Sequence, residues 1–257
     1  MQLAGFEAPP LFKFCPSKYD ISNGCNTIRI GTLWGFREEE NELLRDKGEG
    51  EFEFRIQFPK LTPVSNEWIS EIGMDASGSA YIEEMQSDGG AISIKGATLK
   101  GSSHNCWIFC VSMGGDAVGN VSEAHESQWT IPGDKVQEFG NFLATSIWKN
   151  VSIDDLDPNF SKNHSLQEIN AGLALQMEMR PVIYDVRDAH IQSEIDFPVD
   201  KVRELKSSIP FLKPKTFSLE KEFRFAFWLS FNNQRISVNN KPKILQLREI
   251  DQLIRRK

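Results

Sequence analysis

Alternation of apolar and polar side chains predicts several of the strands in this chain. Residues 51–58 (EFEFRIQF) alternate along their whole length, as a half-buried strand does. Residues 11–15 and 27–33 are shorter candidates, which we expect to pair with each other as a hairpin or through a short loop. Residues 106–112 (CWIFCVS) form a continuous apolar run, which is typical of a central strand buried on both faces.

The strongest strand signal in the second half of the chain is residues 218–231 (SLEKEFRFAFWLSF). Phenylalanines alternate with polar residues at first, and the segment then becomes wholly apolar. We therefore predict one long strand near the centre of the sheet. Weaker patterns predict strands at 91–100 and 182–186, and a strand with a short helix in the tail at 244–254.

Helical patterns are fewer. Residues 132–147 carry apolar side chains at spacings of three and four, which predicts an amphipathic helix. Residues 36–46 are charged and acidic at their start, which favours a second helix. We also expect a short helix at residues 200–206. Because strands and helices do not alternate evenly, we expect an α+β fold with a mixed, mostly antiparallel central sheet and flanking helices, in a single domain over residues 1–257.

Composition narrows the classes of function. The net charge of −7 argues against a protein that coats nucleic acid non-specifically, because such proteins need clustered positive charge. It leaves room for an enzyme that acts on a nucleic-acid end through a local basic patch. The first residues lack the features of a signal peptide, and no stretch approaches the roughly 20 apolar residues that span a bilayer. We expect a cytoplasmic protein that does not bind membranes.

Two groups of residues could be taken for metal ligands. His104, Cys106 and Cys110 match no common zinc-binding spacing, and both cysteines lie inside an apolar run, so buried thiols are the favoured interpretation. The acidic segment 154–157 lacks the glycine and the closing glutamate of a calcium loop, which favours a solvated acidic loop.

Residues 31–50 (GTLWGFREEENELLRDKGEG) hold a dense set of opposite charges bounded by glycines. One interpretation is a helix stabilised by side-chain pairs at three- and four-residue spacing. The other is that an arginine, such as Arg37, is fixed beside a cleft where it binds a phosphate or carboxylate in bidentate fashion.

Glu220, Lys221 and Glu222 open the long predicted strand. Side chains alternate along a strand, so Glu220 and Glu222 would share one face, together with Arg224. One interpretation is an exposed polar face on which glutamate pairs with arginine. The other is a carboxylate at the border of the core, where its pKa is shifted or where it binds a substrate hydroxyl.

The motifs LFKF, GTLWGFREEEN with RDKGEG, WIFCVS and KPKTFSLEKEFRF occur in an order that resembles the bacterial domain-of-unknown-function family twenty-nine seventy-one. The same order is similar to ADP-ribosyltransferases of the arginine–serine–glutamate kind. Those proteins carry a basic residue on an early strand, a serine-bearing strand, and a Glu-x-Glu motif that opens a later strand. This resemblance implies an ADP-ribosyltransferase-like fold that takes NAD as substrate and requires no metal.

The resemblance also implies roles for individual residues. Glu222 would bind a hydroxyl of the nicotinamide ribose and face the positive charge that develops on that sugar. Glu220 would orient or deprotonate the acceptor as a general base, and Ser112 would shape the nicotinamide pocket. The cation that neutralises the pyrophosphate would be one of Lys13, Arg29 and Arg37.

Three hypotheses remain open at this point. The first is an ADP-ribosyltransferase that modifies a protein or nucleic-acid acceptor, as an effector of a bacterial or phage conflict system. The second is a non-enzymatic interaction protein in defence or anti-defence, which binds through its acidic surface. The third, which is weaker, is a nuclease or hydrolase that holds a metal with Asp46, Glu49 and Glu222.

Overall fold

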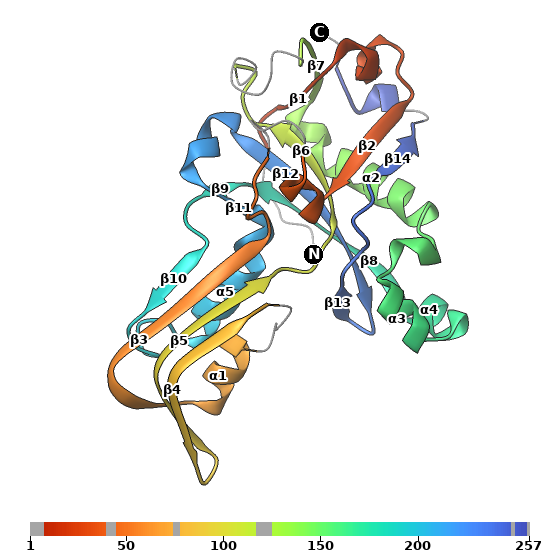
Figure 1. The fold of residues 1–257 in the computed structure, drawn as a ribbon. Coiled ribbons are helices and arrows are strands. Elements are labelled where there is room, and N and C mark those ends of the chain that lie inside the picture. The colour runs from red at the N-terminus through yellow and green to blue at the C-terminus, as the bar shows by residue number, and fades with distance from the viewer. Residues whose placement is uncertain (1–7, 40–44, 74–77, 117–124, 248–249, 256–257) are drawn as a thin grey trace. The chain divides into compact units, whose positions relative to one another are not determined.

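The computed structural model describes residues 8–39, 45–73, 78–116, 125–247 and 250–255. These residues form an α+β fold whose sheets are mostly antiparallel, as the sequence predicted (Figure 1). The chain divides into two compact units, each with its own hydrophobic core, where the sequence led us to expect one domain. Unit 1 comprises Met1–Lys47, His104–Val182 and Thr216–Lys257, and unit 2 comprises Gly48–Ser103 and Ile183–Lys215.

Unit 1 is built, over its described residues, on an eight-stranded sheet with three α-helices. Its strands are β1 (Leu11–Cys15), β2 (Thr27–Thr32), β6 (Trp107–Ser112), β7 (Ser127–Ile131), β8 (Leu173–Pro181), β12 (Glu222–Phe231), β13 (Gln234–Ile236) and β14 (Lys243–Gln246). Its helices are α2 (Val136–Lys149), α3 (Pro158–Asn163) and α4 (Leu166–Gly172).

Strand β12 pairs with β8 along one edge. Along its other edge it pairs first with β6, through Glu222–Phe227, and then with β13, through Leu229–Phe231. The far edge of β6 is shared. Strand β2 pairs with its beginning, and β1 pairs with its end through Phe12 and Ser112. The predicted pairing of β1 with β2 is therefore wrong: β1 pairs with β7, and β2 with β14 from the end of the chain. A local alternating pattern identifies a strand but carries no information about its partner.

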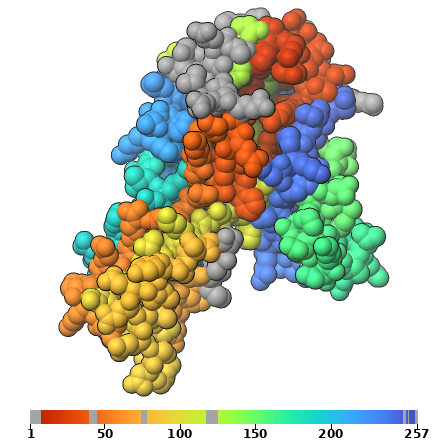
Figure 2. All heavy atoms as spheres, viewed as in Figure 1, coloured from red at the N-terminus to blue at the C-terminus, as the bar shows by residue number. Residues whose placement is uncertain are grey.

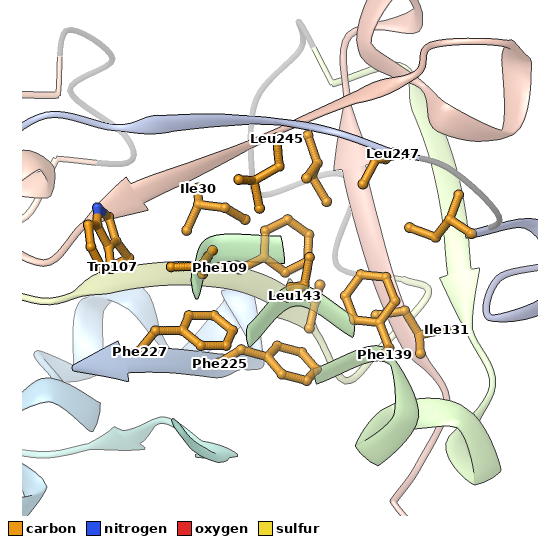
Figure 3. Packing of buried hydrophobic residues seen from close by; sticks show 14 of the residues in the cluster. Ile30, Trp107, Phe109, Ile131, Phe139, Leu143, Phe225, Phe227, Leu245 and Leu247 are labelled. Atoms are coloured by element: carbon orange, nitrogen blue, oxygen red, sulfur yellow. The ribbon is translucent and has the colours of Figure 1, made fainter. Parts of the chain in front are cut away.

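The core of unit 1 is rich in aromatic rings (Figure 3). Phe225 on β12 and Phe109 on β6 both contact Phe139 of α2, with ring centroids 5.7 and 5.8 Å apart. Leu143, one turn further along α2, is buried in the same cluster. The predicted amphipathic helix is thus confirmed, although it begins at Val136 after a short 3-10 turn.

Strand β12 begins at Glu222, later than predicted. The preceding residues Lys215–Glu220 form a 3-10 helix, η8, and Lys221 has a positive φ of 47°. Glu220 is therefore not part of the strand, and the expectation that it shares a strand face with Glu222 is wrong. Of the helix predicted at 36–46, only Phe36 and Arg37 are helical, in the 3-10 turn η3 (Trp34–Arg37). Residues 38–39 and 45–46 are not helical, and residues 40–44 lie outside the described residues.

Unit 2 contains a four-stranded sheet in the order β10-β3-β5-β4, with helices α1 and α5 packed together in its core (Figure 1). Its elements are β3 (Glu51–Val64), α1 (Asn66–Gly73), β4 (Ala80–Asp88), β5 (Ala91–Ser102), β9 (Ile183–Tyr184), β10 (Asp188–Ile191), α5 (Val199–Ser208) and β11 (Leu212–Lys213). The alternation predicted for 51–58 is confirmed, since Phe52, Phe54, Ile56 and Phe58 are buried in this core.

Strand β4 forms one edge of this sheet, and most of its side chains are exposed. It contributes to the yellow and orange surface in Figure 2. Within the described ranges, none of the helices combines the length and the apolar character of a membrane-spanning segment.

Candidate functional site

The candidate site lies where β1, β6 and β12 meet in unit 1. Glu222, the first residue of β12, is opposite Ser112, the last residue of β6, and Ser112 is also opposite Phe12 of β1. Phe223, Phe225 and Phe227 of β12 enter the aromatic core. Because side chains alternate along a strand, Glu222 and Arg224 lie on the other face of the sheet.

Glu222 and Arg224 form a buried ion pair. The Nε atom of Arg224 donates a hydrogen bond to Oε1 of Glu222 at 2.6 Å, and the two side chains are only 1% and 6% exposed. The Arg224 guanidinium also lies over the ring of Phe36, 5.9 Å from its centroid. A charge-assisted bond of this length compensates part of the cost of burying both charges and fixes the orientation of the carboxylate.

The backbone around Glu222 is fixed by neighbouring segments. The N–H of Met113 donates to the carbonyl of Lys221 at 2.7 Å, and the N–H of Val182 donates to the carbonyl of Glu222 at 2.9 Å. The Lys221 ammonium binds Asp116 at 2.9 Å. The positive φ of Lys221 is unfavourable for a residue with a side chain. These contacts therefore stabilise the turn in its strained conformation.

Lys13 approaches the site from β1. Its Nζ donates to the carbonyl of Cys110 at 2.9 Å and lies 5.0 Å from the ring centroid of Phe109. Burial lowers the pKa of Lys13, while the negative charge of Glu222 raises it. The charge of Glu222 therefore acts on the ammonium, whereas the hydrogen bond and the ring contact of Lys13 are with β6 on the core side of the sheet.

Cys110 lies opposite Arg224, on the same face as Glu222. Burial raises the pKa of the Cys110 thiol well above its ordinary value, and the nearby Glu222 carboxylate raises it further. The side chain is thus a neutral thiol at physiological pH and not a thiolate nucleophile.

His125, which precedes β7, was not singled out from the sequence. Burial lowers its pKa, and the charge of Lys13 lowers it further, so the ring is neutral near pH 7. Its Nδ1 atom is buried and has no hydrogen-bond partner among the described residues. A lone histidine before a strand gives no sequence signal that it lies near Lys13, because that proximity depends on the pairing of β1 with β7.

The other predicted site residues lie at separate positions. Glu220 ends η8. Arg29 is exposed on β2, opposite Ile244 of β14, and its positive charge contributes to lowering the pKa of Lys13. Arg37 ends η3, where its guanidinium lies 5.3 Å from the ring centroid of Trp34. The structure thus brings Glu222 and Ser112 together, with Lys13 near them.

Unit 2 contains a separate cavity of about 660 Å³, lined by acidic and basic side chains that include Glu53, Lys100 and Arg187. Glu53 is bound by Lys100 at 2.9 Å. Arg187 donates to two backbone carbonyls and to the buried Glu49, at 3.4 Å from that carboxylate. Glu53, Lys100 and Arg187 are thus ion-paired with side chains of unit 2 itself.

Among the described residues, there is no group of three or more histidine, cysteine, aspartate or glutamate side chains that could hold a metal ion. None of the family models, curated proteins or solved structures compared with the chain matches it.

Proposed function

We propose that this protein is an ADP-ribosyltransferase-like enzyme that cleaves NAD and modifies a macromolecular acceptor. The observation that carries the proposal is the adjacency of β1, β6 and β12, three strands that lie far apart in the sequence. The basic, serine-bearing and glutamate-bearing segments of the sequence resemblance are therefore neighbours in one sheet, with Ser112 directly opposite Glu222.

The chemistry follows from the fixed carboxylate. When the bond between nicotinamide and ribose breaks, its electron pair leaves with nicotinamide and positive charge develops on the sugar. Glu222, held by Arg224, would stabilise that charge electrostatically and bind a ribose hydroxyl. The acceptor nucleophile would then attack the sugar carbon and lose a proton, for which Glu220 on η8 is the proposed general base. Ser112 would form part of the nicotinamide pocket.

A second candidate function is supported by a different observation. Glu222 is nearly buried and ion-paired with Arg224, which also suits a purely structural role for the pair. The protein would then be a non-enzymatic interaction protein in a conflict between bacteria and phage. The enzyme hypothesis predicts the same biological setting, with the protein as an effector, so measurements on the purified protein have to separate the two functions.

The test is transfer of label from NAD. Purified protein is incubated with NAD labelled in its adenosine part and with fractions of a whole-cell lysate, and label on protein and on RNA is measured together with released nicotinamide. We expect transfer by the wild type and a loss of roughly 100- to 1,000-fold in Glu222→Gln, because one fixed electrostatic contact to the transition state is removed.

A matched control is available in unit 2. Glu49 is also a buried carboxylate that is ion-paired with an arginine, so Glu49→Gln makes the same chemical change outside the proposed site. We expect it to retain transfer. Circular dichroism establishes that each variant is folded. Equal activity of the wild type and Glu222→Gln, or no transfer and no nicotinamide release by folded wild type with any fraction, would contradict the proposal.

A further inference from the structure

Strand β4 (Ala80–Asp88) leaves one edge of the unit 2 sheet open (Figure 1). Among the described strands it pairs with β5 alone, and the opposite edge of the sheet is the much shorter β10. Alternate residues of an edge strand direct their N–H and C=O groups away from the sheet, where these groups can pair with a further strand. With nine residues, β4 offers such groups along most of the sheet edge.

The face of β4 on the helix side of the sheet is apolar. Ile82 lies directly opposite Ala97 of β5, which is buried in the core that contains α1 and α5. Met85 lies opposite Ile94, which is buried in the same core, so both side chains point to this face. Ile82 and Met85 nevertheless remain 47% and 43% exposed. The helix layer therefore leaves this edge of the sheet partly uncovered.

The outer face of β4 combines an aromatic and an acidic side chain. Tyr81 lies opposite Thr98 and is 70% exposed. Glu83 occupies the space above Gly96, in which any other residue would place its own side chain. The next residue, Ala97, faces the core, so Glu83 is on the outer face together with Tyr81.

The open edge is also negatively charged. Strand β4 carries three carboxylates, those of Glu83, Glu84 and Asp88, and no basic side chain. Glu84 binds Lys95 of β5 at 3.3 Å, but these two side chains are 42% and 43% exposed, and an ion pair in contact with water contributes little. A cation on a neighbouring strand would therefore be attracted to this edge.

We propose that β4 binds an extended segment of a partner protein in which basic side chains alternate with apolar ones. Backbone hydrogen bonds along the open edge would add this segment to the sheet as a further strand. Its basic side chains would lie on the outer face beside Tyr81 and Glu83, and its apolar side chains beside Ile82 and Met85 on the other face. A lysine or arginine can pair with the carboxylate and lie over the tyrosine ring at the same time.

The acidic side chains argue against a second copy of this chain as the occupant. Pairing of two β4 strands would bring their carboxylates together, and like charges on paired strands repel. The register of β4 against β5 also shifts between Ile82 and Met85. Charged side chains and such irregularities are common on edge strands, where they prevent identical edges from pairing. The same negative charges attract a basic strand.

The probe is a fluorescein-labelled peptide of eight residues in which lysine and valine alternate. Fluorescence anisotropy measures its binding to the full chain, and amide hydrogen exchange locates it. We expect binding that weakens as the salt concentration rises, and slower exchange within Ala80–Asp88. An analogue with glutamate in place of lysine reverses the charge, and one with proline in place of two valines lacks backbone donors. Each should bind roughly 10-fold more weakly or less.

Charge-reversed variants test the edge from the side of the protein. Glu83→Lys/Glu84→Lys should weaken binding of the lysine–valine peptide by roughly 10-fold, because attractive contacts become repulsive. Asp200→Lys/Glu204→Lys makes the same change in net charge at exposed positions of α5 and should bind like the wild type. Circular dichroism establishes that both variants are folded, and the peptide analogues give an answer that depends on neither variant.

Several results would overturn the inference. They are absence of binding by the folded wild type at millimolar peptide, equal binding of the proline analogue, and equal effects of the two charge-reversed variants. Sedimentation analysis adds a further one, since self-association that Glu83→Lys/Glu84→Lys alters would make a second copy the occupant. The residues concerned belong to unit 2, and no NAD is present, so the outcome is independent of the proposed transferase.

Discussion

Breaking the Glu222–Arg224 pair should destabilise the protein strongly, and the two halves of the pair should not contribute independently. The perturbation is a double-mutant cycle of Glu222→Gln, Arg224→Met and the combined variant. The bond is 2.6 Å long and both side chains are almost completely buried, so water cannot take the place of either partner in the folded protein. A remaining charge would therefore keep most of its desolvation cost.

The magnitudes follow from this burial. Arg224→Met leaves the carboxylate of Glu222 without its guanidinium, which we expect to lower the free energy of unfolding by about 3–5 kcal/mol. Glu222→Gln leaves a neutral amide beside the guanidinium, and we expect a loss of about 1–3 kcal/mol. In the double variant neither charge is buried, so the total should be smaller than the sum of the single losses, with a coupling energy of about 2–3 kcal/mol.

The assay is urea unfolding followed by tryptophan fluorescence and by far-ultraviolet circular dichroism. Two probes are needed because the chain divides into two compact units that can unfold in separate steps. The cycle is evaluated on the transition that Arg224→Met shifts. Single losses that add to within about 0.5 kcal/mol, or a loss below about 1 kcal/mol in Arg224→Met, would refute the buried ion pair as the element that fixes Glu222.

Two other predictions concern the surroundings of the site. Lys221→Val should be about 1–2 kcal/mol less stable than Lys221→Gly in urea unfolding, because Lys221 has a φ of 47° and a β-branched residue disfavours that conformation. Both variants lose the contact with Asp116, so they differ only in the side chain at this φ. Equal stabilities would show that the turn is not strained. The folded pKa of His125 lies below its ordinary value of 6.5, so the unfolded chain binds the proton first and stability is lost as the pH falls through about 6.5. The loss between pH 7 and pH 5 should therefore be smaller in His125→Gln than in the wild type, and identical losses would show that His125 does not titrate in this way.

The strands were predictable because their signal is local. The alternation over 51–58 appears in the structure as buried Phe52, Phe54, Ile56 and Phe58. The partners were not predictable, since β2 pairs with β14 from the end of the chain, and no pattern within residues 27–32 encodes that choice. The two cores were missed for the same reason, because unit 2 is assembled from two separate stretches of the sequence.

The site was predictable only in part. The spacing of Glu222 and Arg224 identified the carboxylate and its partner on one strand face, which the structure confirms. The same spacing placed Glu220 on that face, and this failed because Lys221 adopts a positive φ that lysine rarely takes. The sequence predicted a strand at 182–186, where the short β9 (Ile183–Tyr184) lies, but it missed β8 (Leu173–Pro181), whose pairing with β12 depends on contacts distant in the sequence.

The choice between an enzyme and an interaction protein can be tested before any acceptor is known. A structural role for Glu222 requires only its ion pair with Arg224. The proposed transferase must also bind NAD, and a ligand that binds only the folded state stabilises it by about 2.7 kcal/mol at a concentration of 100 Kd. NAD should therefore raise the melting temperature of the wild type. An interaction protein whose ion pair is purely structural would show no such shift, so this measurement separates the two hypotheses.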